Sequence, residues 1–123
     1  MGVINDISFK AHIVKGEGKG TGLGTPTLNL DLSEVPSELE DGIYAVYADG
    51  MDCVMFYGEK GTVGKGRSCE VHLLERSVIS VPRSVLKVEI VGKIREVEKF
   101  ETEDLLKAQI TLDIEKAKNI LNK

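Results

Sequence analysis

Alternating apolar and polar positions predict β-strands along most of this chain. Residues 7–14 place Ile, Phe, Ala and Ile on one face and Ser, Lys and His12 on the other, which is the two-residue period of a half-buried strand. His12 falls on the polar face, so we expect it to be solvated. Five further segments are predicted strands, by alternation, by an apolar run or by the turn that precedes them: 28–32, 42–48, 51–57, 69–75 and 85–91.

Turn and helix signals complete the predicted order. Asp49-Gly50 is a strong signal for a two-residue hairpin, and the polar stretch 33–41 is expected to be a loop. Thr102 can cap a helix whose acidic first turn suits the positive end of the helix dipole. One apolar stripe then follows: Leu106, Ile110, Ile114, Ala117 and Leu121. Consecutive strands without intervening helices favour an antiparallel sheet or a closed barrel, in one domain over residues 1–123.

Charge and composition exclude several classes of partner. The formal net charge is −4, which argues against a nucleic-acid or membrane-surface partner because such binding uses a basic face. No apolar run approaches the ~18–20 residues of a membrane-spanning helix, and the N-terminus lacks the apolar core of a signal peptide. Cys53 and Cys69 do not form a Cys-x-x-Cys motif, so we expect buried free thiols in a cytoplasmic protein.

A glycine-rich segment, Gly16–Gly24, separates the first two predicted strands. Glycine reaches positive φ at low cost and leaves backbone N–H groups accessible, which suits phosphate oxygens. The segment lacks the Gly-Lys-Ser/Thr ending of a P-loop, and Pro26 follows where a dinucleotide motif would begin a helix. A flexible surface loop is the alternative interpretation.

Three short patterns could carry chemistry. Thr27 and Asn29 are two residues apart in an extended segment, so their oxygens face one side and suit a hard cation such as Mg²⁺. Glu70 and His72 share one face of the predicted strand 69–75, where a solvent-exposed or edge position is the alternative. Residues 58–68 combine four glycines with Lys60, Lys65 and Arg67. That segment is either a mobile hairpin tip or a flap that closes over a phosphate ligand.

These residues together resemble the riboflavin kinase (flavokinase) family. The pattern Gly-x-Gly-x-Gly-x-x-Leu-Gly-x-Pro-Thr-x-Asn-Leu over 16–30 resembles the family's nucleotide loop. Further matches follow in the family's order: Gly42-Ile43-Tyr44, Glu70-Val71-His72-Leu73-Leu74, Gly92-Lys93-Ile94-Arg95, Lys99-Phe100 and Gln109-Ile110-x-x-Asp113. The matches cover roughly residues 9–121. A single glycine motif would be unspecific, whereas several ordered motifs are specific.

The resemblance implies a fold and a reaction. It implies a mainly β protein, a six-stranded antiparallel closed β-barrel with a C-terminal α-helix. It also implies a cytoplasmic, monomeric enzyme that transfers the γ-phosphoryl of ATP to the 5′-hydroxyl of riboflavin to give FMN. The expected metal is Mg²⁺, with Zn²⁺ or Mn²⁺ as alternatives, and no nucleic-acid or membrane partner is expected.

The resemblance also assigns roles to individual residues. Glu70 corresponds to the catalytic base, and Thr27 and Asn29 to the metal ligands. Arg95 is expected at the phosphate of the flavin product and Phe100 at the flavin, with simple packing as the alternative for Phe100. The expected nucleotide-binding residues are Gly16, Gly18, Lys19, Gly20, Thr21, Thr27 and Asn29. His72 receives no chemical step.

Two departures from the family keep a second function open. Val81-Pro82-Arg83 stands where the family has a Tyr-Gly pair, and Gly61-Thr62-Val63-Gly64 replaces a Pro-Thr pair. These changes favour a non-catalytic flavin- or nucleotide-binding module with a degenerate pocket, whereas retention of Thr27, Asn29 and Glu70 favours the kinase. An adaptor barrel is disfavoured by the acidic balance and the few aromatic residues. Because only a short segment precedes the first matched strand, we expect no adenylyltransferase activity that would make FAD.

Overall fold

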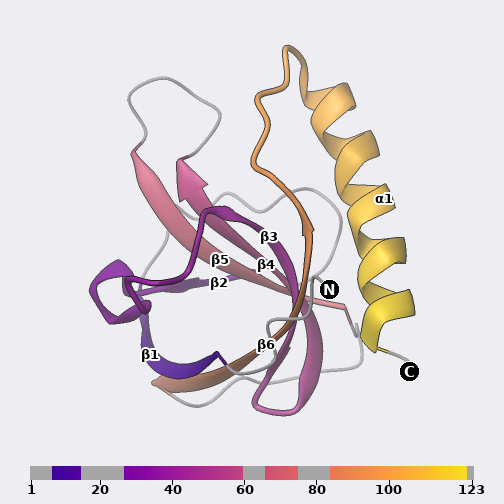
Figure 1. The fold of residues 1–123 in the computed structure, drawn as a ribbon. Coiled ribbons are helices and arrows are strands. Elements are labelled where there is room, and N and C mark those ends of the chain that lie inside the picture. The colour runs from indigo at the N-terminus through magenta and orange to yellow at the C-terminus, as the bar shows by residue number, and fades with distance from the viewer. Residues whose placement is uncertain (1–6, 15–26, 60–65, 75–83, 122–123) are drawn as a thin grey trace.

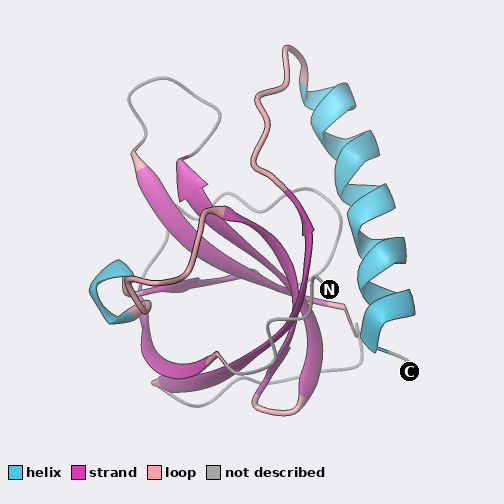
Figure 2. Ribbon diagram, in the orientation of Figure 1, coloured by secondary structure: helices cyan, strands magenta, loops and turns pink. Residues whose placement is uncertain are grey.

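The fold is a closed barrel with one helix packed on its outside (Figures 1 and 2). The computed structural model describes residues 7–14, 27–59, 66–74 and 84–121. Its elements are β1 (Ser8–Val14), β2 (Thr27–Leu30), β3 (Gly42–Ala48), β4 (Met51–Glu59), β5 (Arg67–Leu73), β6 (Val85–Arg95) and α1 (Glu103–Leu121). The strands pair antiparallel in the order β1-β2-β5-β4-β3-β6, and β6 pairs back with β1. The expected six-stranded antiparallel barrel with a C-terminal helix is therefore confirmed.

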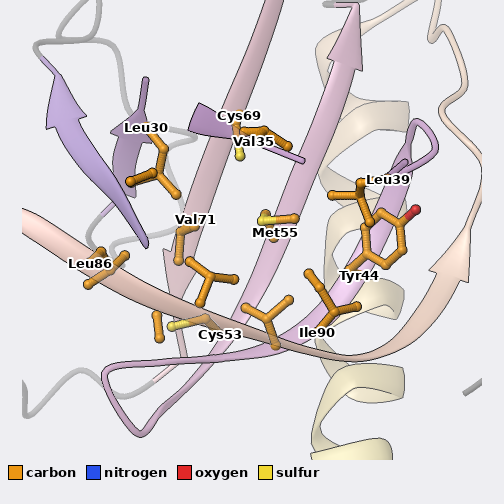
Figure 3. Close-up of a cluster of buried hydrophobic side chains, with 14 of the residues drawn as sticks. Leu30, Val35, Leu39, Tyr44, Cys53, Met55, Cys69, Val71, Leu86 and Ile90 are labelled. Carbon is orange, nitrogen blue, oxygen red and sulfur yellow. The ribbon is translucent and has the colours of Figure 1, made fainter. Parts of the chain in front are cut away.

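The interior of the barrel is filled by the apolar positions of each strand (Figure 3). In β5, Cys69, Val71 and Leu73 are buried while the residues between them face outward, as expected for a strand with period two. Burial raises the pKa of both thiols, Cys53 and Cys69, to about 12. Both cysteines are free and buried, so they pack the core and are not reactive groups.

A second apolar cluster lies between the barrel and α1. Ile43 and Ala45 of β3 and Val54 of β4 point outward and contact Ala117 and Leu121 of the helix. β3 is therefore covered on both faces, which accounts for its continuous apolar sequence. Within the described residues, no helix is long and apolar enough to span a membrane.

The helix differs from its predicted stripe in the first turns. Residues 103–108 are all exposed, Leu106 included, while Asp113 is buried. The N-terminal turns of α1 extend beyond the barrel wall in Figure 1, so an apolar position there finds no partner on the sheet. Of the predicted stripe, Ile114, Ala117 and Leu121 pack against the barrel.

The connections also refine the sequence prediction. Asp49 and Gly50 both have positive φ, 49° and 82°, which confirms the tight hairpin and its primed turn. The alternation over 28–32 does not continue as a strand, because β2 ends at Leu30 and a 3₁₀ helix occupies Leu32–Glu34. The Asp31 side chain accepts the Ser33 N–H and begins that helix. His12 is exposed as expected, but its Nδ1 also lies 3.0 Å from the Glu34 carboxylate.

A buried ion pair joins α1 to the end of β6. Arg95 donates from Nε to Asp113 Oδ1 and from Nη2 to Oδ2, each at 2.9 Å, and Gln109 donates to Oδ1 at 3.1 Å. The side chains of Arg95 and Asp113 are 14% and 3% exposed. Arg95 Nη1 also donates a hydrogen bond to the Glu96 carbonyl, so all three nitrogens of the guanidinium have a partner. Such a bidentate, fully bonded pair fixes the orientation of the helix.

Removing one partner of this pair tests that view. Asp113→Ala leaves the Arg95 guanidinium nearly buried without its counter-ion, so we expect the free energy of unfolding to fall by about 3 kcal/mol. Glu115→Ala, on an exposed position of the same helix, is the control and should change it by less than about 0.5 kcal/mol. Urea unfolding followed by circular dichroism measures both. Equal stability of the two variants would contradict the anchoring role.

Candidate functional site

Four polar side chains meet on the outer face where β2 pairs with β5. In this pairing Thr27 lies opposite His72 and Asn29 opposite Glu70. Directly opposed residues of an antiparallel pair point to the same side of the sheet, with Cβ atoms about 4.5–5.5 Å apart. We call Thr27, Asn29, Glu70 and His72 the β2–β5 polar cluster. The residues between them, Leu28 and Val71, face the barrel core instead.

Hydrogen bonds and burial order this cluster. The Thr27 hydroxyl oxygen lies 3.0 Å from His72 Nδ1, and His72 Nε2 lies 3.9 Å from Glu70 Oε1. Ser68, also on this face of β5, donates from Oγ to Glu70 Oε2 at 3.2 Å. The side chains of His72 and Glu70 are only 12% and 22% exposed. Burial lowers the pKa of His72, partly offset by the nearby Glu70, which favours the uncharged imidazole.

The donor set of the cluster fits a hard cation. Thr27 and Asn29 supply a hydroxyl and a carboxamide on one face of β2, and Mg²⁺ accepts neutral oxygens when phosphate and water complete its shell. Within the described segments, no three or more His, Cys, Asp or Glu gather as metal ligands. A cation at this position would therefore rest on the two neutral oxygens, with the Glu70 carboxylate on the neighbouring strand.

Arg95 and Phe100, the residues predicted for the flavin side, are brought together at the other end of β6. The Arg95 guanidinium carbon lies 5.6 Å from the centroid of the Phe100 ring, a cation–π arrangement. The same guanidinium already holds the Asp113 carboxylate. The role of Arg95 at a phosphate therefore stays a prediction, and a phosphate there would share the fork with Asp113.

Other predicted residues fall outside the described residues. These are Gly16, Gly18, Lys19, Gly20 and Thr21 of the glycine-rich segment, Lys60 and Lys65 of the predicted flap, and Val81-Pro82-Arg83.

Arg67, the remaining cation of the predicted flap, is committed to a carboxylate. Its Nη1 and Nη2 donate to the two oxygens of Asp41 at 3.0 and 2.6 Å, and its guanidinium lies 5.1 Å from the Tyr57 ring centroid. The hydrogen bonds from Arg67 lower the pKa of Asp41. Sequence reasoning missed both carboxylate partners, Asp41 and Asp113, because each lies far along the chain from its arginine.

A separate depression lies away from the cluster. It has a volume of about 490 Å³ and is lined by Lys10, Asp49, Val85 and Lys87 from β1, the β3–β4 hairpin and β6. Of the predicted site residues that the structure describes, none lines this depression. Among the residues that the structure describes, the β2–β5 polar cluster is the candidate site, because it combines possible cation ligands with a carboxylate.

Comparison with known proteins identifies the family of this chain. The family model described as riboflavin kinase matches residues 4–121. The bifunctional riboflavin kinase/FMN adenylyltransferase of Haemophilus influenzae is 32% identical over 117 residues, covering 90% of this chain and 37% of that protein. The chain thus spans little more than a third of this curated relative.

Two solved structures share the fold. One, described as a macrolide-efflux protein from Streptococcus pneumoniae, superposes with a TM-score of 0.73 at 24% identity, over 91% of this chain and 38% of that one. The other, riboflavin kinase from Trypanosoma brucei, superposes with a TM-score of 0.64 at 17% identity, over 94% and 80% of the two chains. The fold defines a small antiparallel barrel of the flavokinase type. The chain belongs to the riboflavin kinase family.

The ion pair between Arg67 and Asp41 can be tested by titrating the Asp41 carboxyl group. In Arg67→Gln the hydrogen bonds that lower the pKa of Asp41 are lost, so we expect that pKa to rise toward its ordinary value. Because the folded pKa is depressed in the parent, the pair stabilises the fold above the unfolded pKa, and this contribution disappears as pH falls through the folded pKa. Carbon-detected NMR of Asp41 measures the change. An unaltered Asp41 pKa would contradict the pairing.

Proposed function

We propose that this protein transfers the γ-phosphoryl group of ATP to the 5′-hydroxyl of riboflavin and releases FMN and ADP. One observation carries the proposal: the β2–β5 register sets Asn29 opposite Glu70 and Thr27 opposite His72 on one face of the sheet. Membership of the riboflavin kinase family supports the choice of substrates. Phosphoryl transfer needs positioning, charge neutralisation and a proton acceptor, and the cluster holds candidates for all three.

Glu70 is the proposed general base. Its carboxylate accepts the proton of the riboflavin 5′-hydroxyl while the 5′-oxygen forms a bond to the γ-phosphorus. The bond from that phosphorus to the β–γ bridging oxygen breaks, and its electron pair leaves with ADP. The Ser68 hydroxyl donates to one oxygen of Glu70 at 3.2 Å, which restricts the orientation of the carboxylate.

Thr27 and Asn29 are the proposed ligands for Mg²⁺. When bound, the ion neutralises the negative charge of the nucleotide phosphates during transfer. The hydroxyl and carboxamide oxygens orient it from one face of β2 and contribute no charge of their own. Zn²⁺ and Mn²⁺ are alternatives with the same donor set.

The remaining assignments come from the family resemblance. Gly16, Gly18, Lys19, Gly20 and Thr21 would cradle the nucleotide phosphates through backbone N–H groups. Arg95 and Phe100 would border the flavin at the far end of β6, where the Arg95–Asp113 pair holds the guanidinium in place. A non-catalytic flavin- or nucleotide-binding module is the second candidate, favoured by the altered segments 61–64 and 81–83.

The reaction itself is the first test. Purified protein incubated with riboflavin, ATP and Mg²⁺ should form FMN and ADP in equal amounts, as the membership of the riboflavin kinase family leads us to expect. Chromatography with flavin fluorescence and nucleotide absorbance measures the products. Riboflavin binding without phosphorylation, under any of the three metals, would instead support the non-catalytic module.

Separate substitutions distinguish the base from the metal ligands. Glu70→Gln keeps size and hydrogen-bonding capacity but accepts no proton, so turnover should fall by about 10²–10⁴ while MgADP affinity hardly changes. Asn29→Ala removes a metal ligand, so MgADP should bind more weakly and metal-free ADP about as before. Glu89→Gln, on an exposed position of β6, is the matched control and should behave like the parent.

Calorimetry with and without Mg²⁺ measures both affinities. If Glu70→Gln weakens MgADP binding as much as Asn29→Ala does, Glu70 belongs to the metal shell and is not the base. Turnover of Glu70→Gln at the rate of the parent would also exclude it as the base.

A further inference from the structure

We propose that His72 is a positioning residue whose ring aims the Thr27 hydroxyl at the cation and links that ligand to Glu70. In this arrangement the hydroxyl donates its proton to His72 Nδ1, and His72 carries its own proton on Nε2. The proposal rests on the proposed function, because it concerns how Thr27 would hold the metal of the kinase reaction.

The backbone holds the two residues in contact. Thr27 and His72 are directly opposed in the β2–β5 register, so their side chains leave the sheet side by side. The Thr27 oxygen lies 3.0 Å from Nδ1, a normal hydrogen-bonding distance. With the imidazole only 12% exposed, little solvent competes for that nitrogen. The pairing is therefore a built-in feature of the two strands.

The surroundings of the ring select one tautomer. A neutral imidazole has one N–H donor and one bare acceptor nitrogen. His72 Nε2 faces Glu70 Oε1 at 3.9 Å, too far for a direct hydrogen bond but close enough for electrostatics to matter in a partly buried site. A bare Nε2 would direct its lone pair at the carboxylate, whereas an Nε2–H directs a positive dipole at it. The proton therefore resides on Nε2 and the lone pair on Nδ1.

This tautomer decides what Thr27 offers to a ligand. Because Nδ1 can only accept, the Thr27 hydroxyl donates to it, and both oxygen lone pairs are left for other partners. With its proton directed at Nδ1, the Thr27 hydroxyl presents its lone pairs to a cation, as a metal ligand must. In the opposite tautomer Nδ1–H would occupy one of those lone pairs and weaken the ligand. The His72 ring thus contacts the proposed metal ligand Thr27 through Nδ1 and faces the Glu70 carboxylate through Nε2.

The first test is the tautomer of the metal-free protein. A long-range ¹⁵N–¹H correlation spectrum distinguishes protonated from bare ring nitrogens, and the chain has only two histidines, His12 and His72. The spectrum of His12→Gln assigns the His72 signals. We expect a bare Nδ1 and a protonated Nε2. A protonated Nδ1 overturns the proposal.

The second test uses two substitutions that keep different parts of the ring. In His72→Asn, the side-chain Oδ1 takes the place of Nδ1 and can still accept the hydrogen bond from Thr27. In His72→Gln, the side-chain amide takes the place of Nε2, so the acceptor for Thr27 is lost. If His72 acts through Thr27, His72→Gln should weaken MgADP binding by about 10-fold or more and His72→Asn by much less. Metal-free ADP should bind both variants like the parent, and Thr27→Val should abolish the difference between them.

A purely packing role predicts another outcome. In that case the two variants would weaken binding equally, with and without Mg²⁺, and that result overturns the proposal. It is also overturned if the parent binds MgADP no more tightly than ADP. None of these measurements uses riboflavin, so they are independent of the assay for FMN. Absence of FMN from the parent would refute the proposed function while leaving the tautomer and the metal affinities to decide the role of His72.

Discussion

The pairing of β2 with β5 is the constraint on which the proposed site depends. β2 and β5 are far apart in the sequence. Their pairing register nevertheless sets Asn29 beside Glu70 and Thr27 beside His72. A slip of β2 by one residue would turn Leu28 outward and bury Thr27 and Asn29. The apolar core therefore enforces the chemistry of the outer face, because Val71 and Leu28 must remain inside.

The outer surface of the barrel is divided between packing and polar chemistry. α1 covers β3 and β4 through Ala117 and Leu121, and the Arg95–Asp113 pair fixes the helix to the end of β6. On β5 the outward positions instead carry Ser68, Glu70 and His72, which are joined to one another or to β2 by short polar contacts. A small barrel can thus bury a core, hold a helix and still present a polar face.

Much of this architecture was predictable from local signals, and the limits are physical. Period-two alternation located the strands, and the Asp49-Gly50 hairpin was evident because its turn chemistry is local. The helix stripe failed at Leu106, since periodicity cannot show where the barrel wall ends. Strand pairing, and with it the meeting of Thr27 with His72, required the closed topology. The ion pair between Arg95 and Asp113 forms only when the folded chain brings β6 and α1 together, so no local sequence pattern predicts it.

The most direct test of the central claim locates the metal–nucleotide complex on the protein. Mn²⁺ broadens NMR signals of nearby nuclei, so titration of ¹⁵N-labelled protein with substoichiometric MnADP reports where the ion sits. We expect the amide signals of Thr27, Asn29 and Glu70 to broaden first, and those of Lys10 and Lys87 beside the separate depression to stay sharp. Broadening centred on Lys10 and Lys87, with the β2–β5 polar cluster unaffected, would contradict the assignment of this cluster as the site of phosphoryl transfer.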